Sequence, residues 1–240
     1  KNGNIIFERY NGTGHLPGTD SITTNTALHI ASISKTITAM AILKLAQEGK
    51  LKIDDEFSKY FPQFDYPGVT IRNMLNHRSG LSNYVHSMEA LGWDKHRLVS
   101  NEDVLEFLIH RKSELRDVAP PDTHFSYSNS NYALLALLIE KITGKKYAAY
   151  LDEKFFKPLQ MKNTFVFSLA DSAKTIPSYD WKGKLLPLDF LDPVYGDKNI
   201  YTTVRDLLTW DRALTGNVLF SSETLQQAYA PYSNEKPGIK

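Results

Sequence analysis

The 240-residue sequence predicts an α+β fold in which helices predominate. Apolar residues at helical spacing, with recognisable caps, recur through most of the chain. Strand patterns are few: the segment 3–10 is rich in β-branched and aromatic residues, and the segment 164–167 is a shorter candidate. Because a strand is not stable alone, partner strands must lie in the irregular segment 168–202 or outside these 240 residues.

The composition is that of an ordinary globular protein, and it excludes several classes of function. Hydrophobic residues make up 42% of the chain, and 28 Lys and Arg face 27 Asp and Glu, which gives a net charge of +1. No strong field therefore favours a nucleic-acid partner. The absence of cysteine excludes disulfides, thiolate metal sites and a cysteine nucleophile. No apolar run reaches the length of about 18 residues that a transmembrane helix needs.

The first predicted helix begins near Ser32 and ends before Gly49, a residue typical of the position after a helix. Apolar residues cover most of its circumference, which predicts a helix buried on most sides. Its principal face carries Ile33, Ile37, Met40, Ala41 and Leu45.

The later helices are predicted from their end signals. Thr70 caps a short helix that stops near Gly80, and Ser100 with Asp103 forms a capping box before an amphipathic run. Two helices follow from about residue 130, the first ended by Gly144 and the second by Pro158. Two more helices are predicted at 202–216 and 221–230.

Ser32 and Lys35 form an S-x-x-K pattern at the start of the first helix. Three helical residues advance about 300° and about 4.5 Å, so both side chains leave the same face. A serine hydroxyl needs a base to become a nucleophile, and a desolvated lysine can supply one. The pattern alone is explained more readily by a capping serine beside a surface lysine, and it arises by chance in many proteins.

A second polar group, Tyr127 and Asn129, lies just before a predicted helix. Such a loop can place a proton shuttle and a hydrogen-bonding amide in a cleft, although capping and packing explain the same residues. His77 invites comparison with a Ser–His–Asp triad, but the chain has no G-x-S-x-G elbow. We therefore expect His77 to be structural and to hydrogen-bond to Gly80.

Taken together, these elements resemble the serine β-lactamase and penicillin-binding-protein superfamily, and within it the class C, esterase and D-aminopeptidase-like branch. The resemblance covers nearly the whole chain and rests on an ordered series of segments: "IASISK", "GKLKIDDEFSKYFP", "TIRNMLNHRSGL", "FSYSNSNYALLALLIEKITGKKYAAYL", "PLQMKNTFVF" and "GDKNIYTTVRDLLTW". It implies a β-lactamase/transpeptidase-like fold, with a helical lobe at 53–161 packed on an α/β lobe from 1–52 and 162–240. The α/β lobe would hold an antiparallel sheet flanked by helices.

The resemblance also implies roles for individual residues. Ser32 resembles the acylated nucleophile, and its backbone N–H resembles half of the oxyanion hole. Lys35 resembles its proton-accepting neighbour, Tyr127 the general acid and base, and Asn129 the ligand of the substrate amide and of Lys35. Which of Lys35 and Tyr127 takes the serine proton stays open, since the two would titrate as a coupled pair. Class A enzymes have S-D-N where this chain has "YSN", and no E-x-x-L-N occurs here, so deacylation is expected to depend on Tyr127.

The sequence departs from the family in its third motif, K-[ST]-G or H-x-G. The late candidate "KPG" at 236–238 follows the preceding helix too closely, and its proline suits no interior strand. We therefore expect the C-terminal strands and an initial helix of the family to be missing from this chain. The sheet would then be incomplete, with an apolar face uncovered or filled by another copy.

Two functions follow as expectations. The first is a serine hydrolase that acts through an acyl-enzyme on a β-lactam, a D-amino-acid peptide or a small ester. The second is a β-lactam-binding sensor or non-turnover scaffold on the same fold. In both, the partner is a small molecule or peptide, no cofactor is needed, and the oligomeric state is open. The family suggests an exported bacterial protein, and the seven histidines show no metal-binding spacing, so no metal site is expected.

Overall fold

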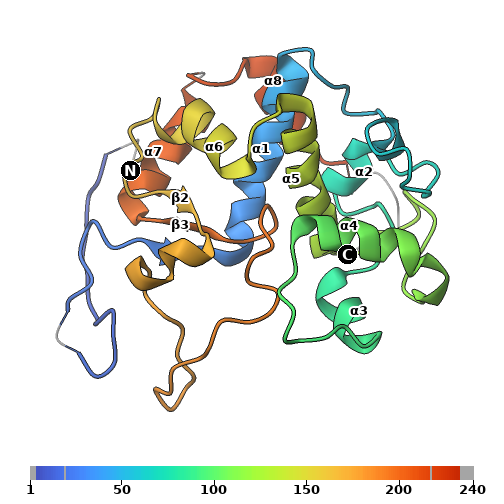
Figure 1. Ribbon diagram of the computed structural model, residues 1–240. Coiled ribbons are helices and arrows are strands. Elements are labelled where there is room, and N and C mark those ends of the chain that lie inside the picture. Colours follow the sequence, from blue (N-terminus) through green and yellow to red (C-terminus); the bar gives the residue numbers. More distant parts are fainter. Residues whose placement is uncertain (1–3, 19, 217, 233–240) are drawn as a thin grey trace.

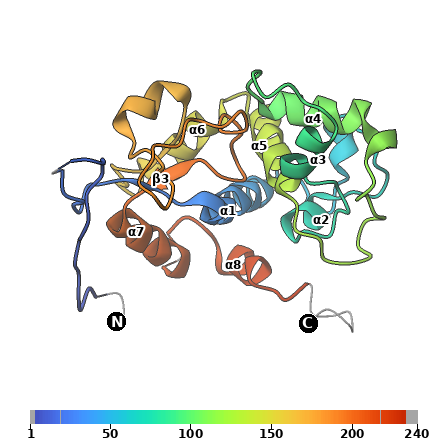
Figure 2. The ribbon, with the colours of Figure 1, turned by 90° about the horizontal axis from the view of Figure 1, so that it is seen from below.

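Helix α1 (Ser34–Gln47) lies at the centre of the computed structural model, which describes residues 4–18, 20–216 and 218–232. It packs against α5 (Asn129–Thr143) on one side and against α8 (Ser222–Ala228) on another (Figures 1 and 2). Most of its side chains are buried, so the prediction of a helix enclosed on most sides is confirmed. The burial of this helix thus fixes the position of the residues at its N-terminal end.

The remaining helices surround this centre. They are α2 (Ile71–Leu75), α3 (Tyr84–Ala90), α4 (Asn101–His110), α6 (Tyr147–Leu151) continued by a π-turn (Asp152–Phe156), and α7 (Val204–Thr215). The predicted cap at Thr70 and the predicted capping box at Ser100 are both present, and Gly144 ends α5 with a left-handed φ of 67°. None of the helices in the described ranges is long and apolar enough to cross a bilayer.

A small antiparallel sheet lies beside the N-terminal end of α1. Its order is β1 (Leu28–His29), β3 (Ile200–Thr202), β2 (Phe165–Val166), with Leu28 opposite Thr202 and Phe165 opposite Tyr201. The predicted strand at 164–167 is confirmed, and its partner lies at the end of the irregular segment, one of the two alternatives considered. The α+β fold with a small, incomplete sheet is therefore confirmed.

The strand predicted at 3–10 is wrong for its described part, because residues 4–10 form no strand and pair with no other strand among the described residues. Ile6 and Phe7 are 78% and 79% exposed, while Arg205 forms an ion pair with Glu8. The residues of this segment favour a strand, but a strand is stable only when a neighbouring strand forms backbone hydrogen bonds with it. This segment runs along the outside of the molecule in Figure 1.

An apolar groove of about 680 Å³ runs along α1 between α2, α7 and α8. Its walls include Met40 and Leu43 of α1, Leu75 of α2 and Trp210 of α7, and Lys35 lies on its surface. Met40 and Leu43 are themselves only 5% and 6% exposed, so α1 stays largely buried beside the groove, and the expected uncovered face of the incomplete sheet stays a prediction. The groove places Lys35 at the boundary between packed core and open surface.

The loop before β3 approaches α5 more closely than a side chain would allow. Gly196 has φ 93°, and a Cβ there would lie 2.5 Å from the carbonyl oxygen of Tyr132. The hydroxyl of Thr38 on α1 donates to the Gly196 carbonyl at 2.6 Å. Residues 196–199 are therefore fixed between α1 and α5, next to the N-terminal end of α1.

Candidate active site

Ser32 lies in a 3₁₀ turn (Ala31–Ile33) between β1 and α1. The sequence predicted a helix that begins near Ser32, whereas the α-helix begins at Ser34. Ile30 N–H donates to the Ile200 carbonyl at 3.0 Å, which ties the turn to β3. Ala31 has φ 45°, a strained backbone conformation for a residue with a side chain. The turn leaves Ser32 exposed at the N-terminal end of the buried helix α1.

Lys35 is 5% exposed, and its Nζ lies directly against the serine. It donates to Ser32 Oγ at 3.1 Å and to the backbone oxygen of Asp197 at 2.6 Å. The predicted sharing of one face by Ser32 and Lys35 is confirmed, since the two side chains meet. A buried amine in contact with a serine hydroxyl can exchange a proton with it.

Tyr127 brings a second proton-transfer group to the same oxygen. Its hydroxyl donates to Ser32 Oγ at 2.9 Å, although the two residues are 95 positions apart in the sequence. Lys35 Nζ lies 5.1 Å from the centroid of the Tyr127 ring. Ser32 Oγ therefore contacts both candidate bases at once, within the range that proton transfer requires.

Asn129 is the first residue of α5, and the structure does not join it to Lys35. Its backbone N–H donates to the Asn83 side chain at 3.2 Å, and no hydrogen bond links its amide to Lys35 among the described residues. The expected Lys35 contact is thus absent from this geometry. Its contact with a substrate amide stays a prediction, as does the oxyanion role of the Ser32 N–H. The rejected "KPG" segment lies outside the described residues.

His77 is structural, but the expected hydrogen bond to Gly80 is wrong. Its Nδ1 accepts from the backbone N–H of Ser128 at 3.2 Å and lies 3.3 Å from the amide nitrogen of Asn131. Gly80 instead accepts from Ala119 N–H. The ring packs against Tyr127 with centroids 4.4 Å apart, so His77 supports the loop that carries Tyr127.

His77 predicts a pH dependence of stability. Burial, and then the charge of Lys35, lower its pKa from 6.5 to about 4. In the unfolded chain this histidine gains a proton below about pH 6.5, but in the folded protein only below about pH 4. The unfolded state therefore binds more protons in this window, and the free energy of unfolding should fall by up to about 3 kcal/mol as pH drops through it.

Urea unfolding at several pH values, comparing the protein with His77→Gln, checks this expectation. The variant should lose stability less steeply between pH 6.5 and 4, whatever its stability at neutral pH. His110→Gln, at an exposed position, is the matched control and should keep the original slope. Equal slopes in the protein and in His77→Gln would contradict the expectation.

Three residues beside the site, Asp197, Lys198 and Tyr84, were not identified from the sequence. Asp197 and Lys198 occur in the segment "GDKNIY", which supports the family resemblance but has no recognisable catalytic spacing. The Tyr84 hydroxyl donates to Asp197 Oδ2 at 2.9 Å, and Lys198 Nζ donates to the Tyr84 oxygen at 3.0 Å. Only packing brings α3 and this loop together.

Within the described ranges no three His, Asp or Glu side chains are grouped so that they could hold a metal ion. The site as described consists of hydroxyl, amine and phenol groups. Such a set supports proton transfer and nucleophilic attack by the serine.

Comparison with known proteins identifies the family of this chain. The family model described as Beta-lactamase matches residues 1–239. Penicillin-binding protein 4* of Bacillus subtilis (strain 168) is 31% identical over 245 residues, which cover 95% of this chain and 54% of that protein. The chain thus spans about half the length of this curated relative.

Two solved structures have the same fold. The penicillin-binding protein from Bacillus halodurans is 26% identical, with a TM-score of 0.79 over 92% of this chain and 69% of that one. The D-amino acid amidase from Ochrobactrum anthropi SV3 is 25% identical, with a TM-score of 0.72 over 90% of this chain and 64% of that one. The fold is that of a β-lactamase/transpeptidase-like protein. The chain belongs to the β-lactamase family.

Proposed function

We propose that the protein is a serine hydrolase that acts through an acyl-enzyme, with Ser32 as the nucleophile. The observation that carries the proposal is the double contact of Ser32 Oγ, with Lys35 Nζ at 3.1 Å and Tyr127 OH at 2.9 Å. An exposed serine with two proton-transfer groups on its oxygen has what nucleophilic attack requires. Its exposure lets a carbonyl substrate approach.

The reaction would take place in two steps. Ser32 Oγ loses its proton to one of its two neighbours, attacks the substrate carbonyl carbon and expels the leaving group, which takes up a proton. Water then attacks the acyl group, with Tyr127 as the base, and Ser32 recovers its proton. Tyr127 is proposed for deacylation because the chain has no E-x-x-L-N glutamate. The Ser32 N–H and Asn129 would bind the substrate carbonyl and amide.

The substrate class we propose is a β-lactam, a D-amino-acid peptide or amide, or a small ester. All three present a carbonyl carbon to a serine nucleophile and release a leaving group that a single proton donor can protonate. The names of the relatives support this range, since one is a penicillin-binding protein and another is a D-amino acid amidase. The partner is therefore a small molecule or peptide.

Intact-mass spectrometry over time tests the proposal. The full-length protein is incubated separately with a penicillin and with a fluorophosphonate, a general reagent for activated serines. We expect a mass increase on one site with both probes, and the penicillin adduct should decay as the hydrolysed product appears. A penicillin adduct that persists would instead indicate a β-lactam sensor without turnover. If the folded protein forms an adduct with neither probe, the hydrolase proposal is wrong.

A further inference from the structure

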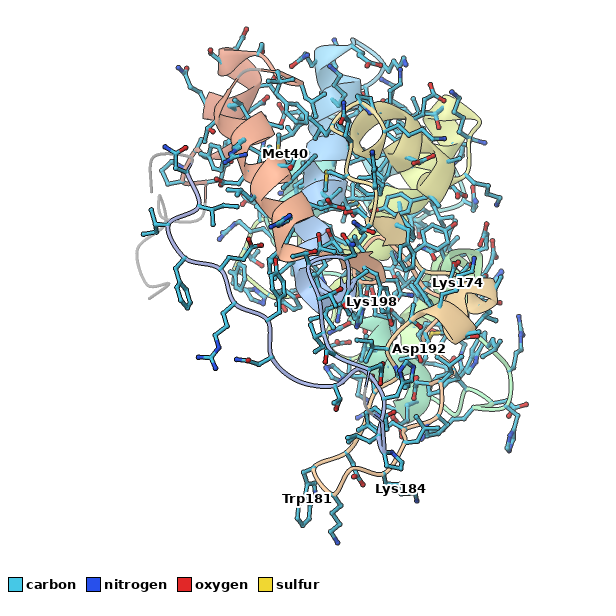
Figure 3. The ribbon with its side chains drawn as sticks, turned by 90° about the vertical axis from the view of Figure 1, so that its left-hand side faces the viewer. Met40, Lys174, Trp181, Lys184, Asp192 and Lys198 are labelled. Carbon is cyan, nitrogen blue, oxygen red and sulfur yellow. The ribbon has the colours of Figure 1, made fainter. Side chains whose placement is uncertain are left out.

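Residues 178–186 form a β-hairpin that projects from the body of the protein (Figure 3). Asp180 N–H donates to the Lys184 carbonyl at 2.9 Å, which closes a loop of three residues. Gly183 in this loop has a left-handed φ of 77°, as hairpin loops of that length commonly require. The Asp180 carboxylate accepts from the backbone N–H groups of Lys182 and Lys184 at 2.8 and 2.9 Å. The conformation of the tip is therefore fixed by its own hydrogen bonds.

A second loop, which contains Leu16, lies against the hairpin. Leu16 N–H donates to the Tyr179 hydroxyl at 2.9 Å, and the Leu16 side chain lies beside Gly183. This second loop is itself closed by Gly14 N–H, which donates to the Asp20 carbonyl at 3.0 Å. In Figure 1 the two loops, in dark blue and in orange, both extend below the N-terminal end of α1. They form one projecting unit, to which Leu16 adds a side chain that is 50% exposed.

The end of this projection exposes large apolar side chains. Trp181 in the loop is 88% exposed, the largest fraction for any large apolar side chain of the described residues (Figure 3). Leu185, Leu186 and Leu188, which follow it, are 56%, 46% and 53% exposed. Turn positions usually hold Gly, Pro, Asn, Asp or Ser, so a tryptophan contributes nothing to the turn itself. Exposed apolar side chains gathered in one place are typical of an interaction surface.

Two lysines accompany the exposed tryptophan. Lys182 Nζ lies 4.7 Å from the centroid of the Trp181 ring, and Lys184 is exposed on the following strand. No ion pair joins either lysine to a carboxylate within the described ranges. The acidic residues on either side, Asp180 and Asp189, already accept hydrogen bonds from backbone N–H groups. The tip therefore carries local positive charge, although the net charge of the whole chain is only +1.

We propose that this tip, residues 178–188 together with Leu16, binds the surface of a lipid bilayer that contains anionic phospholipids. A tryptophan ring suits the boundary between headgroups and acyl chains, because its N–H meets the polar side and its rings the apolar side. The leucines enter the same boundary, while Lys182 and Lys184 lie beside the phosphate groups. The hairpin is already ordered, so binding costs little conformational entropy. The proposal is independent of the hydrolase chemistry.

Other partners suit this tip less well. A glycan needs hydrogen-bond acceptors for its hydroxyl groups beside the aromatic ring, and the carboxylate nearest to the ring, that of Asp180, is occupied by the backbone. A second copy of the chain would bring like charges together. A bilayer with anionic headgroups satisfies both the apolar side chains and the lysines at the same surface.

Co-sedimentation of the full-length protein with lipid vesicles tests the proposal. One set of vesicles is phosphatidylcholine alone, and the other is equal parts of phosphatidylcholine and phosphatidylglycerol. We expect binding to the anionic vesicles to be at least about tenfold stronger, and to weaken in about 0.5 M salt. Trp181→Ala should bind the anionic vesicles at least about tenfold more weakly. The double variant Lys182→Gln with Lys184→Gln should lose about as much on these vesicles.

Two matched controls separate the tip from general stickiness. Phe7→Ala removes an aromatic side chain that is 79% exposed and lies outside the hairpin. Lys141→Gln with Lys162→Gln removes two positive charges at exposed positions elsewhere. Both should bind as the unchanged protein does. The tip substitutions replace exposed side chains, so the melting temperature of these variants should stay close to that of the unchanged protein.

Tryptophan fluorescence provides a measurement that needs no variant for its first step. Anionic vesicles should shift the emission to shorter wavelength, and lipids brominated on their acyl chains should quench it, because Trp181 enters the apolar boundary. Trp181→Ala, which keeps the less exposed Trp93 and Trp210, should show neither effect.

Three results would each overturn the proposal. The first is no sedimentation with anionic vesicles. The second is equal binding by Trp181→Ala and the unchanged protein, or an equal loss in Phe7→Ala. The third is sedimentation with an insoluble glycan such as chitin but not with vesicles, which would make the tip a carbohydrate-binding surface.

Discussion

Ser32→Ala is expected to form no covalent adduct with a penicillin or a fluorophosphonate and to lose at least about 10³-fold in turnover. The substitution removes the oxygen on which Lys35 and Tyr127 converge, and no other hydroxyl replaces it in those two contacts. The remaining site could bind substrate but could not form an acyl-enzyme. Intact mass measured over the same time course as for the unchanged protein checks this.

The fold should tolerate this change, because Ser32 is exposed and its Oγ contacts only those two side chains among the described residues. The melting temperature should therefore stay close to that of the unchanged protein. Ser172→Ala is the control, since the hydroxyl of that exposed serine bonds only to the Leu169 carbonyl among the described residues, and the variant should label normally. An adduct of normal mass and rate on Ser32→Ala would show that the nucleophile has been misassigned.

Tyr127→Phe is expected to lower the turnover rate by at least about 10²-fold, as is Lys35→Ala. Phenylalanine keeps the ring that packs on His77 and lies beside Lys35, but it removes the oxygen 2.9 Å from Ser32 Oγ. The loss therefore isolates the acid–base function of Tyr127 from its packing. Pre-steady-state kinetics with a chromogenic β-lactam or ester measures acylation and deacylation separately.

The step that Tyr127→Phe slows tests the role assigned to Tyr127. If Tyr127 serves both steps, Tyr127→Phe slows acylation and deacylation together, so no long-lived adduct accumulates. Tyr60→Phe is the control, because that hydroxyl bonds to Asp55 rather than to Ser32, and its loss should leave both rates near normal. Near-normal rates in both Tyr127→Phe and Lys35→Ala would mean that their roles are misassigned.

The sequence by itself determined the features that depend on neighbouring residues. The caps at Thr70 and Ser100 and the left-handed Gly144 follow from short-range hydrogen bonding and backbone sterics, so a few letters suffice to predict them. The shared face of Ser32 and Lys35 follows from a spacing of three residues. Tyr127 was added to the site by the family resemblance of the ordered motifs. No local pattern could predict that it lies beside Ser32.

The tertiary structure alone decided which distant groups meet. Lys35 and Asp197 are 162 positions apart, and Tyr84 and Asp197 are 113 positions apart, so their contacts depend on how α1, α3 and the loop before β3 pack. The same dependence explains why residues 4–10 form no strand despite their β-branched pattern, and why His77 bonds to Ser128 rather than to Gly80. The strand propensity of a few residues contributes little free energy, so tertiary packing overrides it. The cost of burying a polar or charged group depends on every group that packs around it, and a local sequence pattern does not show those groups.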